Sequence, residues 1–250
     1  MMKNIQENKI REGLKSIGNF FLDIFFPRNC LGCGKEGKYI CENCRTFLGE
    51  APLICPVCGR GSFSGQRHID CPSRYQLDGL VALWEYEGLI KTAIHYIKYR
   101  KLGDAVSELV VLSLETMSKD KERFASFFSD LFTEKPFITF IPMFSKKERK
   151  RGFNQSELIA RALGKITGLE TISLLEKMKE TESQTRLKKE KRLKNIEGAF
   201  SLKADSLKPP ENLILVDDIW TTGATMKEGA KILKQSGAKK IWGFVLARTV

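Results

Sequence analysis

The sequence contains no apolar run long enough to cross a membrane. Its most apolar N-terminal stretch, residues 20–26, is short and includes Asp23, whereas a spanning helix needs about 20 apolar residues. The stretch also lacks the small-residue cleavage site of a secretory signal. We therefore expect neither a membrane span nor a secretory leader. Apolar residues at helical spacing between positions 10 and 24 instead predict an amphipathic segment over residues 1–27.

Acidic side chains are few compared with basic ones. The chain has 42 Lys and Arg against 30 Asp and Glu, which gives a net charge of +12. This positive charge favours polyanionic partners, either phosphorylated metabolites or nucleic acid. A basic surface without a partner is the alternative. With 250 residues, 42% of them hydrophobic, the chain can form one sizeable core and a small appended module.

Cysteine is absent after position 71, and all seven cysteines lie between positions 30 and 71. They form three Cys-x2-Cys pairs, and a His-x2-Cys pair completes the series. Such a pair places two ligands on one side of a metal ion, so two pairs complete a tetrahedral zinc site. We therefore predict one or two structural zinc ions. The eight candidate ligands are Cys30, Cys33, Cys41, Cys44, Cys55, Cys58, His68 and Cys71.

The spacing leaves open how the four pairs combine. In the simplest arrangement the first two pairs share one zinc ion and the last two share another; in a cross-braced arrangement pairs one and three share a metal. Disulfides are not expected, because the cysteine count is odd and no secretory signal is present. A thioredoxin-like redox pair would need a strand–helix context that this glycine-studded region lacks. Because the region has few apolar residues, its folding should depend on zinc.

Residues 213–225 form the most informative stretch of the chain. An apolar run, 213–216, ends in Asp217 and Asp218, and a small-residue turn leads into a helical pattern over 226–235. The pattern predicts a buried parallel strand that delivers two carboxylates, followed by a loop that opens a helix. Such a loop binds anions, and paired carboxylates bind sugar hydroxyls, which together suit a ribose 5-phosphate. A helix cap is the alternative, but capping needs only one acid.

Strand and helix patterns alternate after the cysteine-rich region. This alternation predicts an α/β fold with a mostly parallel sheet flanked by helices. The expected strands also include residues 80–84, 137–141 and 241–246, and the expected helices include residues 89–100, 104–118 and 157–163.

Two basic stretches lie between the second strand and the Asp pair. Residues 146–155 follow a strand end, where a flexible loop carrying Arg149, Arg151 and Gly152 could hold a pyrophosphate. A solvated charge run is the alternative. Residues 181–195 contain a basic cluster, Arg186 to Lys194, with six basic residues and one acid. Such a cluster is typical of a mobile flap over a phosphate or of a nucleic-acid-binding surface.

Several separated motifs together resemble the ComF family of bacterial phosphoribosyltransferase-like proteins. The resemblance implies a double zinc ribbon over residues 28–76, a type I phosphoribosyltransferase domain over 77–250, and a cytoplasmic location. Some members of that family take part in DNA uptake during natural transformation. The chain departs at His68, where relatives often carry cysteine, and at Trp220, where a small aliphatic residue is usual. Besides the Cys-x2-Cys series, the motifs are Ile97-Lys98-Tyr99, Arg151-Gly152-Phe153-Asn154-Gln155, Ser183-Gln184-Thr185, Arg192 with Asn195, Val216-Asp217-Asp218 and Thr221-Thr222-Gly223.

The resemblance also implies roles for particular residues toward phosphoribosyl pyrophosphate (PRPP) and Mg²⁺. Asp217 and Asp218 would hold the ribose hydroxyls, and Arg149 and Arg151 with Gly152 would stabilise the leaving pyrophosphate. The 5-phosphate would be wrapped by Thr221, Thr222, Gly223, Ala224 and Thr225. The implied reaction transfers a phosphoribosyl group to an unidentified acceptor. The alternative is a non-catalytic accessory protein of DNA uptake that binds single-stranded DNA and retains the PRPP pocket.

Overall fold

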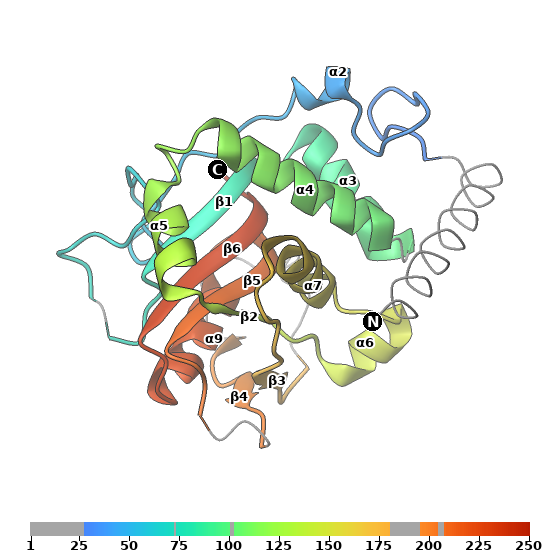
Figure 1. Ribbon diagram of the computed structural model, residues 1–250. Coiled ribbons are helices and arrows are strands. Elements are labelled where there is room, and N and C mark those ends of the chain that lie inside the picture. The colour runs from blue at the N-terminus through green and yellow to red at the C-terminus, as the bar shows by residue number, and fades with distance from the viewer. Residues whose placement is uncertain (1–27, 73, 101–102, 181–195, 205–207) are drawn as a thin grey trace, which may run out of the picture. The chain divides into compact units, whose positions relative to one another are not determined.

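Figure 1 shows the computed structural model, which describes residues 28–72, 74–100, 103–180, 196–204 and 208–250. The amphipathic segment expected over residues 1–27 and the second basic stretch, 181–195, lie outside the described residues. The chain divides into two compact units, one up to Phe47 and one from Leu48 to Val250. The limits of 28–76 and 77–250 stay predictions. None of the described helices is both long enough and apolar enough to cross a membrane.

The first unit is built around its cysteines rather than around an apolar core. Its one described helix, α2 (Glu42–Arg45), begins directly after Cys41. Before that helix the backbone folds back on itself, because the N–H of Cys30 donates to the carbonyl of Lys35 at 2.8 Å. A unit this small needs a further source of stability, such as a metal ion.

The second unit contains a four-stranded parallel sheet, as the sequence predicted. Its strand order is β1-β6-β5-β2, and every neighbouring pair is parallel. Apart from the Asp pair in β5 and polar residues at the strand ends, the two central strands are almost wholly apolar, because helices cover both faces of the sheet. The strands are β1 (Gly79–Glu85), β2 (Phe137–Phe140), β5 (Asn212–Trp220) and β6 (Lys240–Arg248).

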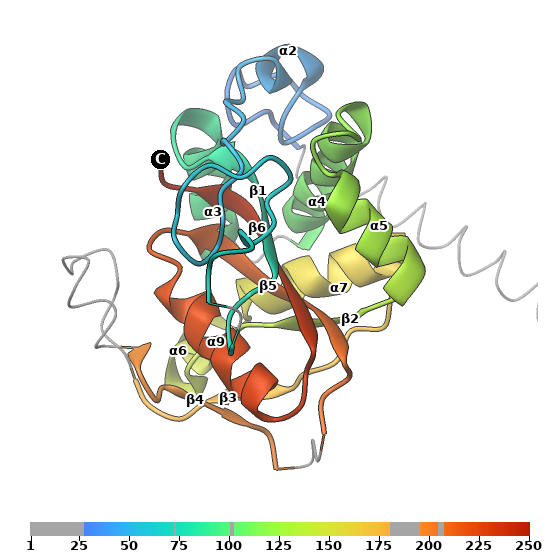
Figure 2. The same cartoon turned by 90° about the vertical axis from the view of Figure 1, so that its left-hand side faces the viewer.

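Helices cover the sheet on opposite faces (Figures 1 and 2). In α7, Gly164 lies against Ile138, and in α9, Gly229 lies against Leu215. Ile138 pairs with Ile214, the neighbour of Leu215 in β5. Since neighbouring strand residues point to opposite faces, α7 and α9 cover different faces. The helices are α3 (Gly88–Arg100), α4 (Gly103–Lys119), α5 (Ala125–Glu134), α6 (Ser145–Arg151), α7 (Gln155–Thr167) and α9 (Ala224–Gln235).

A second, antiparallel sheet joins β3 (Leu175–Lys177) to β4 (Phe200–Leu202). It packs against α9 through Leu175, whose side chain lies beside Gly229. These two strands are only three residues long, and the sequence pattern did not predict them.

The second cysteine-containing segment covers the outer edge of β1. Gln66 forms a bridge with Gly79, the N–H of Leu80 donates to the carbonyl of Gly65 at 2.8 Å, and Glu50 bridges Trp84. An edge strand otherwise presents unpaired backbone groups to other chains. The segment is therefore part of the packed body of this unit.

Two expectations about local structure are wrong. Residues 145–151 form helix α6, not a flexible loop, because their long side chains favour helix. Three basic residues, Arg149, Lys150 and Arg151, also lie in its last turn, where they suit the helix dipole. Strand β5 does not end at the Asp pair but continues to Trp220, since its pairing with β6 extends to Arg248.

Candidate functional site

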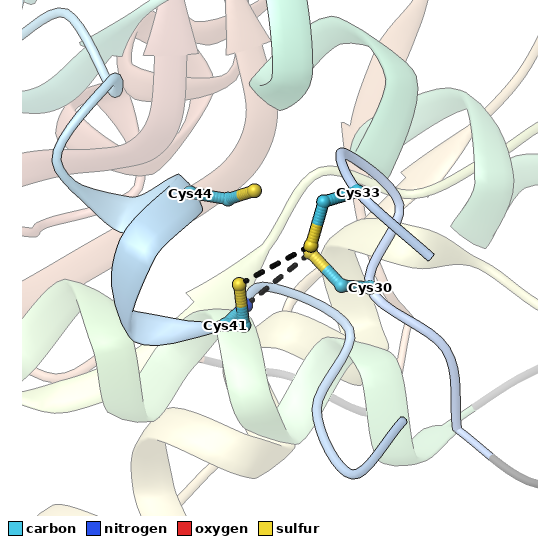
Figure 3. Close-up of side chains that lie close together, drawn as sticks. All are labelled: Cys30, Cys33, Cys41 and Cys44. Carbon is cyan, nitrogen blue, oxygen red and sulfur yellow. Dashed lines mark hydrogen bonds between the residues drawn. The ribbon is translucent and has the colours of Figure 1, made fainter. Parts of the chain in front are cut away.

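The first four cysteines of the chain converge in the first unit (Figure 3). Their sulfur atoms all lie within 4.8 Å of one another. Cys33 Sγ lies 3.6 Å from Cys41 Sγ, and the N–H of Cys41 donates to Cys30 Sγ at 3.4 Å. Figure 3 shows the side chains of Cys30, Cys33, Cys41 and Cys44 directed toward a common centre.

The remaining four candidate ligands converge in the second unit. Cys55 Sγ lies 3.8 Å from Cys71 Sγ, and His68 Nδ1 lies 3.4 Å from Cys58 Sγ. On the other side of the imidazole ring, Nε2 donates to the carbonyl of Gly61 at 2.9 Å. This bond fixes the proton on Nε2, so the Nδ1 lone pair faces the sulfur atoms, as metal ligation requires.

Both clusters fit zinc. A tetrahedral zinc ion with bonds of about 2.3 Å to sulfur separates its sulfur ligands by about 3.8 Å, close to the spacings seen at both sites. Burial acts to raise the pKa of Cys30, but backbone hydrogen bonds from Cys41, Cys33 and Gly32 outweigh it and lower that pKa to about 6. A bond from the Arg60 side chain, followed by one from its backbone, lowers the pKa of Cys58 to about 6. Each site thus holds one thiol that ionises readily. A side-chain hydrogen bond with Cys30 raises the pKa of Cys44, and burial raises that of Cys71, so metal binding at each site must also displace a more tightly held proton.

The structure therefore combines the pairs in sequence order. Pairs one and two form one cluster, and pairs three and four form the other. All seven cysteines are free thiols. Together with the family match below, this geometry supports structural zinc.

Asp217 and Asp218 have different partners. The Ser156 hydroxyl, in the first turn of α7, donates to Asp217 Oδ1 at 2.8 Å, and the N–H of Asp218 donates to the same oxygen at 2.9 Å. Lys98 Nζ of α3 lies 2.9 Å from Asp218 Oδ2. Asp217 is thus held by hydrogen bonds, and Asp218 by an ion pair.

The two carboxylates are also electrostatically unequal. Burial, followed by repulsion from Asp218, raises the pKa of Asp217 from 3.8 to about 7, although the Ser156 bond opposes this. Burial acts to lower the pKa of Lys98, but attraction to Asp218 outweighs it and raises that pKa. Lys98 therefore stays charged, while Asp217 holds a proton near neutrality that a bound cation would displace.

We expect the raised pKa of Asp217 to make stability depend on pH. The folded state holds this proton up to about pH 7, whereas the unfolded chain loses it near pH 4. The contribution of protonated Asp217 to the free energy of unfolding is therefore fully present below pH 4 and is lost as pH rises through 7. The free energy of unfolding of the wild type should therefore fall by on the order of 1–2 kcal/mol between pH 5 and pH 8. Asp217→Asn should not show this fall, because asparagine does not titrate. Thermal melts of both proteins at the two pH values measure this, and equal pH dependence would contradict it.

A tight turn connects β5 to α9. Gly223 is the N-cap of α9 and has a φ of 73°. A Cβ at this position would lie 2.2 Å from the ring of Trp220, so the ring packs directly on the turn. Glycine has no side chain to bond the first N–H groups of α9, and Thr222 Oγ1 accepts only a long bond, 3.4 Å, from the N–H of Ala224. Thr225 lies in the first turn of α9.

The predicted basic residues are placed differently from one another. Arg149 is exposed on α6. The Arg151 guanidinium donates instead to Gln155 Oε1. Gly152 lies between these two residues and ends the helix in a left-handed conformation. The described contacts link this segment to the Asp pair through Ser156, which directly follows Gln155.

Sequence reasoning missed Ser156, the ion-pair role of Lys98, and Lys177. Burial, followed by repulsion from Lys147, lowers the pKa of Lys177 to about 8, while Asp217 opposes the shift. Lys147 of α6 and Lys177 of β3 are therefore within electrostatic reach of each other, and Lys177 is also within reach of Asp217. Ser156 adjoins a recognised motif, which could have identified it. Nothing local in the sequence marks Lys177, because it becomes relevant only when the folded chain brings β3 within electrostatic reach of Asp217.

Comparisons with known proteins agree with this architecture. The family model described as "Double zinc ribbon domain" matches residues 21–72. The chain is 31% identical over 226 residues to "Competence protein ComFC" of Bacillus subtilis, covering 86% of each chain. It is 31% identical over 237 residues to "Competence protein F" of Haemophilus influenzae, covering 90% of this chain and 98% of that one. It is 27% identical over 218 residues to "DNA utilization protein YhgH" of Salmonella typhimurium, covering 84% and 91%.

These features define a class of protein in which a cysteine-rich zinc-binding module precedes an α/β domain with a parallel sheet. Within that class, this chain belongs to the ComF family.

Proposed function

We propose that this chain binds Mg²⁺-PRPP between the carboxyl-terminal half of β5 and the start of α9, and transfers its phosphoribosyl group to an acceptor with release of pyrophosphate. The proposal depends chiefly on one observation: two adjacent carboxylates, Asp217 and Asp218, are followed by a glycine turn that opens α9. A sugar diol needs acceptors, and a 5-phosphate needs backbone N–H groups at a helix N-terminus. Both kinds of group lie within the single segment 217–225.

Each group has a distinct part in the proposed binding mode. Asp217 and Asp218 accept hydrogen bonds from the ribose hydroxyls, and Ser156 and Lys98 hold the two carboxylates in place. Residues 221–225 surround the 5-phosphate, and Gly223 gives this turn its left-handed φ of 73°. Bound Mg²⁺ neutralises charge on the pyrophosphate and ribose oxygens.

The basic residues act on the leaving group in this proposal. As the bond between the anomeric carbon and pyrophosphate breaks, negative charge grows on the pyrophosphate oxygens. Arg149 and Arg151 of α6 supply positive charge there, and Gly152 gives the backbone room, as the family resemblance implies. Lys177 is a further candidate, because its pKa of about 8 leaves it mostly charged at neutral pH. Preorganised charge of this kind stabilises a transition state more than a ground state.

The names of the relatives support a link between this chain and the handling of DNA. They are named for competence and DNA utilization, and we propose that this chain likewise supports DNA uptake. The net charge of +12 suits contact with single-stranded DNA. We also propose a cytoplasmic location, since thiolate zinc ligands persist in a reducing compartment.

Calorimetric titration of the zinc-loaded protein with Mg²⁺-PRPP tests the proposal. We expect micromolar binding, with ribose 5-phosphate and pyrophosphate each binding more weakly because each satisfies only part of the site. Absence of binding to folded protein would overturn the PRPP site. Salt-dependent binding of single-stranded DNA by that protein would then favour a non-catalytic accessory role.

A further inference from the structure

The first turn of α9 is attached to the second cysteine cluster by a lysine. Lys227 follows the phosphate-binding turn proposed above, and its backbone N–H donates to the carbonyl of Gly223 at 2.8 Å. Its Nζ donates to the carbonyl of Val57 at 3.0 Å. Val57 lies between Cys55 and Cys58, inside the third cysteine pair. One side chain thus connects a cysteine knuckle to the beginning of α9, 170 residues further along the chain.

The Trp220 ring continues this connection to the turn itself. Lys227 Nζ lies 5.9 Å from the centroid of the Trp220 ring, and the same ring packs on Gly223. Trp220 is 5% exposed, so the ring has little room to move. The knuckle, the ammonium group, the ring and the turn therefore form a continuous series of contacts.

A second attachment lies at the end of β6. Arg248, 8% exposed, donates from Nε to the carbonyl of Pro52 at 3.0 Å. Arg248 is also the β-sheet partner of Trp220. The N–H of Thr249 donates to the carbonyl of Trp220 at 3.0 Å. The segment that enters the third cysteine pair is thus fixed on the same strand ends that carry the turn.

We propose that Lys227 is a positioning residue that couples zinc at the second cluster to PRPP at the turn. The inference rests on the proposed PRPP site. Zinc held by Cys55, Cys58, His68 and Cys71 fixes the Val57 carbonyl, and Lys227 uses that carbonyl to hold the first turn of α9 ready for a phosphate. Preorganisation of this kind increases affinity because less ordering is left to the ligand. Coupling is reciprocal, so PRPP must also retain zinc.

PRPP affinity is the first measurement. Lys227→Met keeps the aliphatic stem but removes the donor, and we expect the dissociation constant for Mg²⁺-PRPP to rise about tenfold. Lys227→Arg keeps a donor that reaches the carbonyl and should bind PRPP nearly as the wild type does. Lys231→Met is the matched control, because Lys231 lies one turn further along α9 and pairs with Glu228 at 3.6 Å; it should leave the affinity unchanged.

Zinc release to a colorimetric chelator is the second measurement, and it separates positioning from direct phosphate contact. Lys227→Met should lose second-cluster zinc several-fold faster than the wild type without any PRPP. PRPP should slow that release about threefold or more in the wild type and hardly at all in Lys227→Met. His68→Cys, which changes the ligands of the second cluster alone, identifies its kinetic phase.

The outcomes are distinguishable. Weaker PRPP binding by Lys227→Met with unchanged zinc release would mean that Lys227 contacts the phosphate directly, which overturns the coupling. Wild-type behaviour of Lys227→Met in both measurements also overturns it while leaving the PRPP site intact. If the wild type binds no PRPP, the proposed function itself fails, and the coupling fails with it.

Discussion

Replacing Asp217 and Asp218 together by asparagine should weaken Mg²⁺-PRPP binding at least about 100-fold. Each hydrogen bond to a charged group contributes about 1.5–3 kcal/mol, and two such bonds correspond to a factor of about 100 or more. Both carboxylates lie in the carboxyl-terminal half of β5, with side chains only partly exposed. Calorimetry with PRPP and Mg²⁺ measures the loss, and undiminished affinity in a folded double variant would refute the PRPP site.

The control for this experiment must account for Lys98. Its Nζ lies 2.9 Å from Asp218, and the two side chains are 21% and 18% exposed, so Asp218→Asn leaves a largely buried ammonium without its partner. Asp218→Asn combined with Lys98→Met removes both charges and should recover stability while still binding PRPP weakly. Asp217→Asn alone leaves the ion pair intact. Circular dichroism and zinc content establish that each variant is folded.

Gly223→Ala should damage both the fold and the ligand site. The left-handed φ of 73° costs a residue with a Cβ about 1–2 kcal/mol. The new Cβ would also lie 2.2 Å from the Trp220 ring, and such overpacking costs about 1–3 kcal/mol more. Because the turn must shift to relieve the overlap, we expect PRPP affinity to fall at least about tenfold. Denaturant unfolding and calorimetry measure the two effects.

Gly168→Ala is the matched control for that change. Gly168 has nearly the same φ, 76°, but a Cβ there meets nothing within 4 Å. It should therefore show only the backbone cost and bind PRPP as the wild type does. Equal destabilisation by the two substitutions would mean that the Trp220 ring moves away easily, and equal PRPP affinity would remove the turn from the binding site.

The two cysteine clusters of this chain belong to different compact units, so its double zinc ribbon is not a single module. The first cluster lies in a small unit that ends at Phe47, and the second lies in the unit that contains the sheet. Backbone pairing with β1 places the segment of the second cluster along the edge strand of the sheet. Loss of zinc from the second cluster should therefore affect the body of the protein, which provides the physical basis for coupling zinc to a ligand at the sheet.

Several features were predictable because they depend on short-range spacing. Cysteine pairs separated by two intervening residues identify metal ligands, and the alternation of strand and helix patterns identifies a parallel sheet. The segment 213–225 identified a strand, a turn and a helix in order. Helix α6 was missed because a run such as 145–151 reads equally well as a solvated loop when only composition is considered. Short strands such as β3 were missed because three residues carry too little periodicity.

The sequence by itself thus determined the ligand types, the α/β class and the position of the Asp pair. The tertiary structure alone decided which cysteine pairs share a metal, that Lys98 neutralises Asp218, and that Lys227 reaches Val57. The physical reason is the range of the interactions. Spacing and periodicity follow from local backbone geometry, whereas these contacts join segments far apart in the chain and form only when the helices pack on the sheet.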